Sequence, residues 1–177
     1  KSASTRRYRY DIGTDAAAAS PFRRPFEWAL GRPLDLPALR AAATLLHGEH
    51  DFQAFAAKGE PKPHYRCRLD VAEWCERPDG HGASFHVEAD RFLHHMVRML
   101  VGSMVDVGLA RRPLGDVEML LERGDNQRTS PPAPPARPPT APSTEPRRDS
   151  HGWSVACPMT PAPVPAMPLK VPRLPSV

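Results

Sequence analysis

The sequence predicts an α+β fold, in which helices pack on one face of an antiparallel or mixed sheet. Alternating apolar and polar residues indicate strands at 5–13, 65–74 and 83–89. Apolar residues at helical spacing indicate helices at 33–48, 91–109 and 114–124. The two kinds of segment occur mixed along the chain, without the regular alternation of strand and helix that is typical of parallel α/β folds.

The first strand has one aromatic and apolar face and one charged face. Because side chains alternate along a strand, one face receives Tyr8, Tyr10 and Ile12. The other face receives a different set: Arg7, Arg9 and Asp11. We therefore expect a strand that contacts the core on one side and carries basic residues on the other.

The helix at 33–48 has recognisable start and stop signals. Asp35 is the expected N-cap, Pro37 lies in the first turn, and Gly48 fits the C-terminal cap. The two later strands are separated by Pro78, Asp79 and Gly80, which favour a turn, so they are expected to pair antiparallel.

The remaining two predicted helices follow the strand pair. Asp90 is expected to cap the helix at 91–109. The helix at 114–124 has Asp116 near its start and Gly124 at its end.

Length and composition are those of one soluble globular domain. The chain has 177 residues, of which 40% are apolar and 25% charged. The three cysteines lack the CxxC or CxxH spacing of a structural zinc site. A secretory signal peptide and a long apolar run are both missing from the sequence, so we expect a cytoplasmic location. The net charge of +4 is compatible with a polyanionic partner such as nucleic acid.

Proline becomes very frequent after Arg128. Residues 131–177 hold 15 of the 23 prolines, and each removes a backbone donor and opposes regular helix. We therefore divide the chain into a folded part, 1–130, and a disordered Pro-rich tail, 131–177. A Pro-rich linker or a ligand of the SH3 type is the alternative interpretation of the tail.

Arg98 is an unusual residue in the helix predicted at 91–109. Apolar residues cover more than half of the helical wheel, which indicates a mostly buried helix with an arginine near its middle. A buried guanidinium needs a carboxylate, because arginine cannot lose its proton. Asp106 is two turns away, about 12 Å along the axis, so the acid has to come from another element. The alternative is a purely structural partner such as Asp51, or a solvated groove.

The adjacent residues His94 and His95 invite a metal-binding interpretation. Neighbours on a helix point about 100° apart and do not converge on one ion. We therefore predict no metal site.

Four segments in this order resemble the C-terminal half of tRNA pseudouridine synthase A: "TRRYRY", "GEHDFQAF", "FLHHMVRMLVG" and "RTSPPAP". The resemblance covers roughly residues 1–134. It implies an isomerase that converts uridine to pseudouridine in the anticodon stem-loop of tRNA, without a cofactor. An aspartate attacks the nucleoside, and the detached uracil turns and rejoins the ribose through carbon.

The same resemblance implies roles for two residues. Tyr8 is expected to lie against the target base and to assist proton removal, although a core tyrosine is the simpler interpretation of a tyrosine on a strand. Arg98 is expected to pair with the nucleophilic aspartate, so that the carboxylate stays ionised and correctly oriented.

The basic residues near these two positions are candidates for contacts with RNA phosphates. They are Arg6, Arg7, Arg9, Lys62, His64 and Arg66. The three arginines interleaved with aromatic residues are the better candidates, although each of the six taken alone is better explained as a solvated surface charge.

Two features depart from the family pattern. The nucleophile motif, Gly-Arg-Thr-Asp-Ala-Gly, belongs to the N-terminal half and is absent from this chain. Asp15 in "GTDAAA" has different neighbours and follows the tyrosine strand, so we reject it as the nucleophile. Where the family continues with a Gly-Leu-x-Leu-x-x-Val strand, this chain has "RPPTAPST", and we expect the tail to arise from a shifted reading frame or a sequencing error.

Three hypotheses follow. The chain is a partial enzyme, inactive without its nucleophile; or a non-catalytic tRNA-binding module; or a truncated product that does not fold stably, because half a sheet leaves unpaired edges. The resemblance also implies a homodimer that holds tRNA across both subunits.

Overall fold

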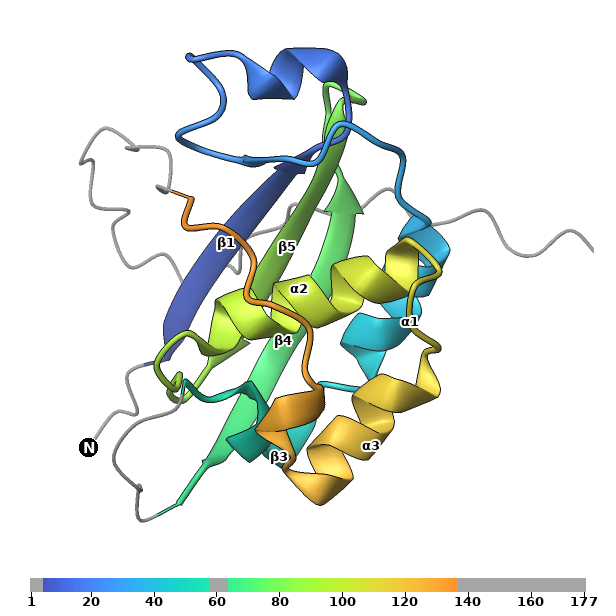
Figure 1. Cartoon of the computed structure of the whole chain (residues 1–177). Helices are drawn as coiled ribbons and strands as arrows, with labels where there is room; N and C mark the ends of the chain where they lie inside the picture. The colour runs from blue at the N-terminus through green and yellow to red at the C-terminus, as the bar shows by residue number, and fades with distance from the viewer. Residues whose placement is uncertain (1–4, 58–63, 137–177) are drawn as a thin grey trace, which may run out of the picture. The chain divides into compact units, whose positions relative to one another are not determined.

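The computed structural model describes residues 5–57 and 64–136 (Figure 1). A five-stranded sheet has the order β2-β1-β5-β4-β3. The strands are β1 (Arg6–Gly13), β2 (Trp28–Ala29), β3 (Gly48–Asp51), β4 (Arg66–Glu76) and β5 (Gly82–Ala89). The helices are α1 (Leu36–Thr44), α2 (Met96–Gly108) and α3 (Gly115–Arg123), with short 3-10 turns at Ala16–Ala19 (η1), Gln53–Phe55 (η2) and Asn126–Arg128 (η3).

The sheet is mixed, and the predicted α+β class is confirmed. β1 pairs antiparallel with β5, in a register that places Tyr8 opposite Val87 and Tyr10 opposite Phe85. β4 and β5 form the predicted antiparallel pair, with an irregularity between Leu69 and Val71. The short β2 pairs parallel with the end of β1.

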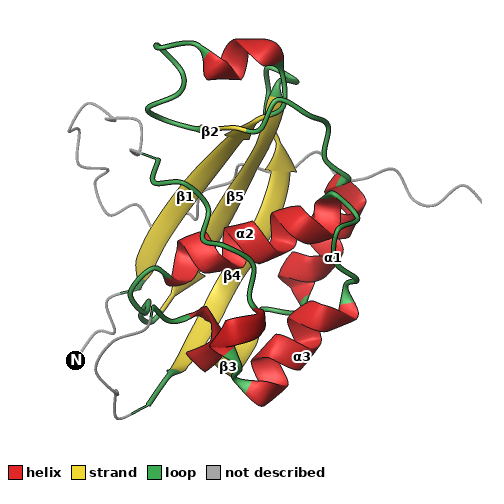
Figure 2. Ribbon diagram, in the orientation of Figure 1, coloured by secondary structure: helices red, strands yellow, loops and turns green. Residues whose placement is uncertain are grey.

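The helices cover one face of the sheet, as expected (Figure 2). Ile12, Phe85 and Trp74 lie on that face and are almost completely buried. The indole Nε1 of Trp74 donates to the sulfur of Met104 at 3.2 Å, which joins β4 to α2. Within residues 5–57 and 64–136, no helix is long and apolar enough to cross a bilayer.

The start of α1 confirms the predicted cap, and its end corrects the prediction. Asp35 Oδ1 accepts a hydrogen bond from the backbone N–H of Ala38 at 3.0 Å. The helix ends at Thr44, and Gly48 is the first residue of β3, with φ +95°. The left-handed backbone of Gly48 therefore turns the chain into β3 instead of capping α1.

The helix predicted at 91–109 begins five residues later, at Met96. Asp90 does not cap it, because Asp90 Oδ1 accepts from the backbone N–H of Arg68 at 2.9 Å and so fixes the chain to β4. The left-handed φ of His95, 64°, marks the turn into α2. The prediction for α3 is confirmed, and Gly124 ends it with φ 65°.

The segment Thr129–Ala136, here called the strap, runs across α2 beside β1 (Figure 1). It fits closely because of Gly102: a Cβ at that position would lie 2.2 Å from the carbonyl oxygen of Pro131. Ala133 is 1% exposed. The first six residues of the segment predicted as a tail are thus described by the structure, and Pro131 and Ala133 among them contact α2. Residues 137–177 lie outside the described residues.

Candidate functional site

The candidate site lies where the helix-covered face of β1, the first turn of α2 and the strap come together. β1 supplies Tyr8 and Tyr10, which are two residues apart and share this face. α2 supplies Arg98, and the strap supplies the backbone of Ala133 and Pro134. Three segments distant in sequence therefore form one cluster.

Tyr8 is the accessible aromatic residue of this cluster. It is 50% exposed, and its ring packs edge to face against Phe92, with centroids 5.0 Å apart and an interplanar angle of 90°. The interpretation as a core tyrosine therefore fits Tyr10, which is 6% exposed, and does not fit Tyr8. The geometry leaves Tyr8 held from one side and open to a ligand.

The Tyr10 hydroxyl is a buried hydrogen-bond donor. It donates to the carbonyl oxygen of Pro134 at 2.6 Å and so ties the strap to β1. Burial raises the pKa of the Tyr10 phenol well above its usual range, and the positive charge of Arg98 offsets part of this rise. The phenol is therefore protonated, and a donor, at physiological pH.

Arg98 is held by the strap through its backbone and its side chain. Its guanidinium Nε donates to the carbonyl oxygen of Ala133 at 2.6 Å, and the Ala133 N–H donates to the Arg98 carbonyl at 2.9 Å. The late start of α2 makes Arg98 the third residue of the helix, not a mid-helix residue. Its side chain consequently reaches the N-terminal end of α2.

No carboxylate of the described residues pairs with Arg98. Asp106 is two turns away from Arg98 along α2 and pairs with Arg111 at 3.3 Å instead. Asp51 Oδ1 accepts from the backbone N–H of Gln53 at 2.9 Å, so a pair with Asp51 is not formed. Nη1 and Nη2 of Arg98 have no hydrogen bond to any residue that the structure describes.

The surroundings of Arg98 favour an anionic partner. The first turn of a helix carries partial positive charge from its free N–H groups, which disfavours a cation there. Half-burial adds a desolvation cost for the guanidinium. A carboxylate beside Nη1 and Nη2 would offset both effects.

His94 and His95 precede Arg98 at the start of α2. Their rings lie 4.0 Å apart, and the His94 carbonyl accepts from the N–H of Ala57 at 3.0 Å. Burial, followed by the charges of His94 and Arg98, lowers the pKa of His95. The shift favours the neutral form of His95, which adds no charge next to Arg98.

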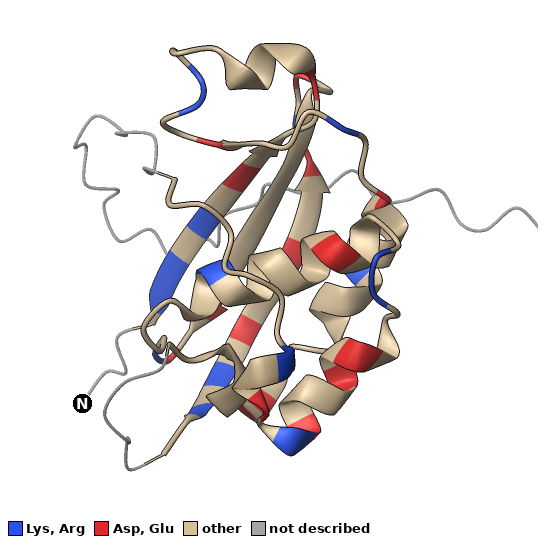
Figure 3. Cartoon of the chain, viewed as in Figure 1, with Lys and Arg blue, Asp and Glu red and all other residues tan. Residues whose placement is uncertain are grey.

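Basic residues occur on β1 and at the start of α2 (Figure 3). Arg7 and Arg9 lie on the face of β1 away from the helices and are paired, Arg7 with Glu88 at 2.6 Å and Arg9 with Asp11 at 2.8 Å. Arg6 is exposed and shares the face of Tyr8. Of the three arginines, Arg6 is therefore the one placed to flank Tyr8.

The other predicted RNA contacts lie just before β4 and at its first residue. His64 is exposed and lies 3.2 Å from the guanidinium of Arg91. Arg66 is exposed and lies 3.6 Å from Glu49. Lys62 lies outside the described residues. His64 thus contacts the neighbour in sequence of Phe92, whereas Arg66 lies on β4 opposite Asp51 of β3.

Asp15 belongs to a network of charged residues around the loop between β1 and β2. Its carboxylate is 2.8 Å from Arg23, which also pairs with Glu27 at 2.7 Å. Glu27, 4% exposed at its side chain, is paired in turn with Arg77. The hydrogen bond from Arg23 is the main cause that lowers the pKa of Asp15. Asp15 is thus paired with an arginine of the loop between β1 and β2.

Sequence reasoning missed Phe92, Tyr10 and the strap as parts of this site. Phe92 was assigned to a helix, and residues 131–136 of the strap to a tail. Only the period-2 pattern of the first strand pointed to Tyr10, by placing it on the same face as Tyr8.

Comparison with known proteins identifies similar sequences. A family model described as tRNA pseudouridine synthase matches residues 42–141. Tyr8 lies before the matched range, and Arg98 and the strap lie inside it. The chain is 42% identical over 131 residues to tRNA pseudouridine synthase A of Myxococcus xanthus, an alignment that covers 73% of this chain and 48% of that protein.

Two further proteins of the same name agree with this result. The protein of Frankia casuarinae is 46% identical over 125 residues, covering 70% of this chain and 44% of that protein. The protein of Halalkalibacterium halodurans is 37% identical over 134 residues, covering 75% of this chain and 49% of that protein. The chain thus spans about half the length of the curated relatives it matches.

Proposed function

Because the chain belongs to the tRNA pseudouridine synthase family, we propose that it provides the C-terminal half of an enzyme that isomerises uridine to pseudouridine in the anticodon stem-loop of tRNA. The single observation that carries this proposal is that Arg98 lacks an acidic partner among the described residues. Its half-buried guanidinium lies in the first turn of α2, and its charge acts on Tyr10 of the β1 face that also carries Tyr8. The missing acid is the nucleophilic aspartate of the other half.

In this reaction Arg98 acts on the aspartate. Its Nη1 and Nη2 pair with the carboxylate, which lowers the pKa of the acid and fixes its direction toward the nucleoside. The contact from Nε to Ala133 keeps the guanidinium in place before the acid arrives. The ionised carboxylate then attacks the ribose and the bond from the ribose to the uracil nitrogen breaks. The turned uracil rejoins the ribose through carbon as the carboxylate leaves.

Tyr8 acts on the base. Its half-exposed ring offers a surface on which an extruded uracil stacks, since Phe92 supports the ring from the other side. The hydroxyl assists removal of the proton from the carbon that forms the new bond. No cofactor takes part, because the leaving group and the returning group are the same uracil.

RNA contacts extend around this site. Arg6 is the leading candidate for a phosphate near Tyr8; Arg7, Arg9, Lys62, His64 and Arg66 are candidates for the wider rim. The paired Arg7 and Arg9 keep exposed guanidinium edges and would have to exchange or share their carboxylate partners. We place the enzyme in the cytoplasm as a homodimer that holds tRNA across both subunits.

The alternative is a tRNA-binding module without catalysis. The observation that favours it is the same absence of an aspartate beside Arg98 in the part of the chain that the structure describes. Both functions predict salt-sensitive tRNA binding, and only the first predicts turnover.

Reconstitution separates the two functions. The 177-residue chain is mixed with a polypeptide that carries the Gly-Arg-Thr-Asp-Ala-Gly motif of a relative, and release of tritium from [5-³H]uridine in an anticodon stem-loop is measured. We expect no release by either part alone and release by the mixture. Turnover by the 177-residue chain alone would contradict the assignment of the acid to the other half.

A further inference from the structure

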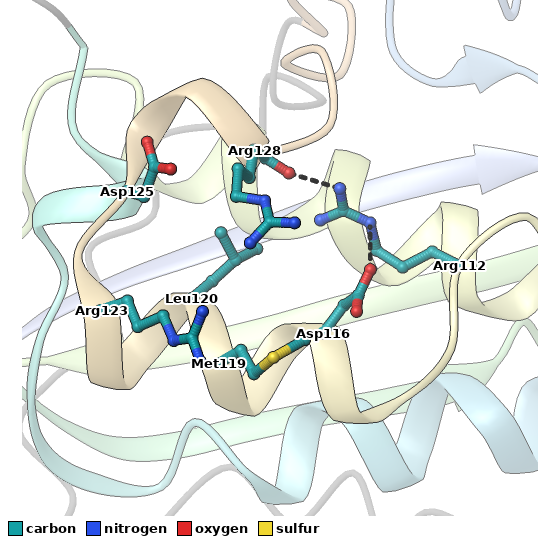
Figure 4. A pocket seen from close by; sticks show the side chains of 7 residues that line it. All are labelled: Arg112, Asp116, Met119, Leu120, Arg123, Asp125 and Arg128. Atoms are coloured by element: carbon teal, nitrogen blue, oxygen red, sulfur yellow. Dashed lines mark hydrogen bonds and ion pairs between the residues drawn. The ribbon is translucent and has the colours of Figure 1, made fainter.

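A second polar site lies between α3, the turn before it and η3. It is a cavity of about 300 Å³ (Figure 4). Its lining consists of Arg112, Asp116, Met119, Leu120, Arg123, Asp125 and Arg128. The site described above uses none of these residues.

Three guanidinium groups point into the same space (Figure 4). Arg112 comes from the turn before α3, Arg123 from the last turn of α3, and Arg128 from η3. Like charges repel, so three cations around one cavity are unfavourable unless an anion joins them. The arrangement therefore favours binding of an anion.

The two acids of the cavity do not neutralise these arginines. Asp125 Oδ1 accepts from the backbone N–H of Gln127 at 2.9 Å and so caps η3. Asp116 Oδ2 lies 3.6 Å from Arg112 Nε, a long ion pair. Arg123 and Arg128 form no side-chain ion pair with any residue within 5–57 and 64–136. Three cations against two anions leave the lining with excess positive charge.

Arg112 shows the need for an acceptor most directly. Its side chain is 17% exposed, and its Nη2 donates to the carbonyl oxygen of Arg128. Its Nη1 is buried and has no hydrogen-bond partner among the described residues. A buried donor without an acceptor costs about 1–3 kcal/mol. An anion in the cavity would remove this cost.

From these observations we propose that the cavity binds a phosphate group, held by Arg112, Arg123 and Arg128. Guanidinium forks match phosphate oxygens in pairs of parallel hydrogen bonds. The source of the phosphate is the RNA backbone, in which case the inference rests on the proposed function, or free inorganic phosphate. The chemistry of the site is the same for both sources.

Charge removal in two variants tests the site. Arg123→Gln and Arg128→Gln remove the charge, keep a polar side chain and leave Arg112 in place. The matched control is Arg111→Gln, which removes the same charge from an arginine that is 55% exposed, pairs with Asp106 and lies outside the lining. Thermal unfolding of all three checks that they fold.

The first measurement is the dissociation constant for tRNA as a function of KCl concentration. We expect each cavity variant to weaken binding on the order of tenfold, as expected for the loss of a charged hydrogen bond, and to reduce the slope of log K against log salt by about one. The control variant should keep a slope close to that of the wild type. This result supports an RNA phosphate as the ligand.

The second measurement is a titration of the 177-residue chain with inorganic phosphate, followed by the Nε–Hε NMR signal of Arg112. A saturable shift that Arg128→Gln abolishes and Arg111→Gln retains supports a free-phosphate site, even where tRNA binding is unchanged. The absence of both a saturable shift and a selective loss of tRNA affinity would overturn the proposal.

Failure of this proposal is distinguishable from failure of the proposed function. If reconstituted enzyme forms pseudouridine and the cavity variants behave like the control, only the phosphate site is wrong. If the phosphate signal is present and no pseudouridine forms, only the function is wrong.

Discussion

Arg98 and Ala133 are joined by two hydrogen bonds that run in opposite directions, from the guanidinium Nε to the Ala133 carbonyl at 2.6 Å and from the Ala133 N–H to the Arg98 carbonyl at 2.9 Å. One residue of the strap therefore fixes both the backbone and the side chain of the arginine. The remaining nitrogens of the guanidinium have no hydrogen bond to a described residue. The position of the strap on α2 thus determines the orientation of the Arg98 guanidinium.

Gly102→Ala should displace the strap. The added Cβ would meet the Pro131 carbonyl at 2.2 Å, which a backbone atom cannot relieve without moving. We expect a loss of about 1–3 kcal/mol in the free energy of unfolding, typical of overpacking, measured by urea denaturation. In reconstituted enzyme the turnover rate should also fall, because Arg98 loses its support.

The matched control is Gly115→Ala, at the first residue of α3, where a Cβ meets nothing within 4 Å. This change should be neutral or slightly stabilising, since alanine favours helix over glycine. Equal stability of the two variants would show that the strap does not lie on Gly102 as described.

Arg98→Lys should retain the positive charge and lose the planar guanidinium with its several N–H donors. A lysine ammonium cannot bind Ala133 through one nitrogen and an acid through two others, so the positioning of the carboxylate is lost. We expect tritium release by reconstituted enzyme to fall on the order of 10²-fold, comparable to the loss of one preorganised donor. Arg111→Lys is the control, and its rate should equal that of the wild type. An Arg98→Lys enzyme with full activity would remove Arg98 from the mechanism.

Sequence patterns predicted the fold class well and the site in part. Strand periodicity placed Tyr8, Tyr10 and Ile12 on one face, and the cap at Asp35 is confirmed. The start of α2 was predicted wrongly, because Phe92 and Leu93 continue the apolar spacing of the helix although they pack from a turn. Local spacing does not show that Asp90 is bound to β4.

The strap could not be predicted for a related reason. Six prolines and alanines, residues 131–136, have the composition of a flexible segment, and their order depends on contacts with distant residues. Gly102 permits the contact and Tyr10 holds it, yet neither residue stands near the strap in the sequence. The resemblance pointed to Arg98, and only the structure shows what supports it.

Tyr10→Phe should remove the buried hydrogen bond to Pro134. The lost bond leaves the Pro134 carbonyl without this donor, which costs about 1–2 kcal/mol. Tyr8→Phe is the control, because the Tyr8 hydroxyl has no hydrogen bond to the residues that the structure describes. Urea unfolding at pH 7 should show a clear loss for the first variant and little change for the second.

The same residue gives a pH test. Burial raises the pKa of Tyr10 in the folded state, so the unfolded state releases the proton first. The stability due to Tyr10 is complete below the usual tyrosine pKa of about 10 and declines as the pH rises above it. The difference in unfolding free energy between wild type and Tyr10→Phe should therefore shrink between pH 9 and pH 11. A constant difference would mean that Tyr10 is not buried as a neutral phenol.

Glu27→Gln should destabilise the loop between β1 and β2. The Glu27 side chain, 4% exposed, pairs with Arg23 at 2.7 Å and also with Arg77. The substitution therefore removes one negative charge that two arginines share. Breaking a buried pair costs about 3–5 kcal/mol. We expect a loss near the lower end of that range, because Asp15 and Asp79 still pair with the two arginines. Glu122→Gln, an exposed change on α3, is the control and should shift the unfolding free energy by less than about 0.5 kcal/mol. Urea denaturation measures both, and a Glu27→Gln protein as stable as the control would show that the network contributes nothing to holding β2 against β1.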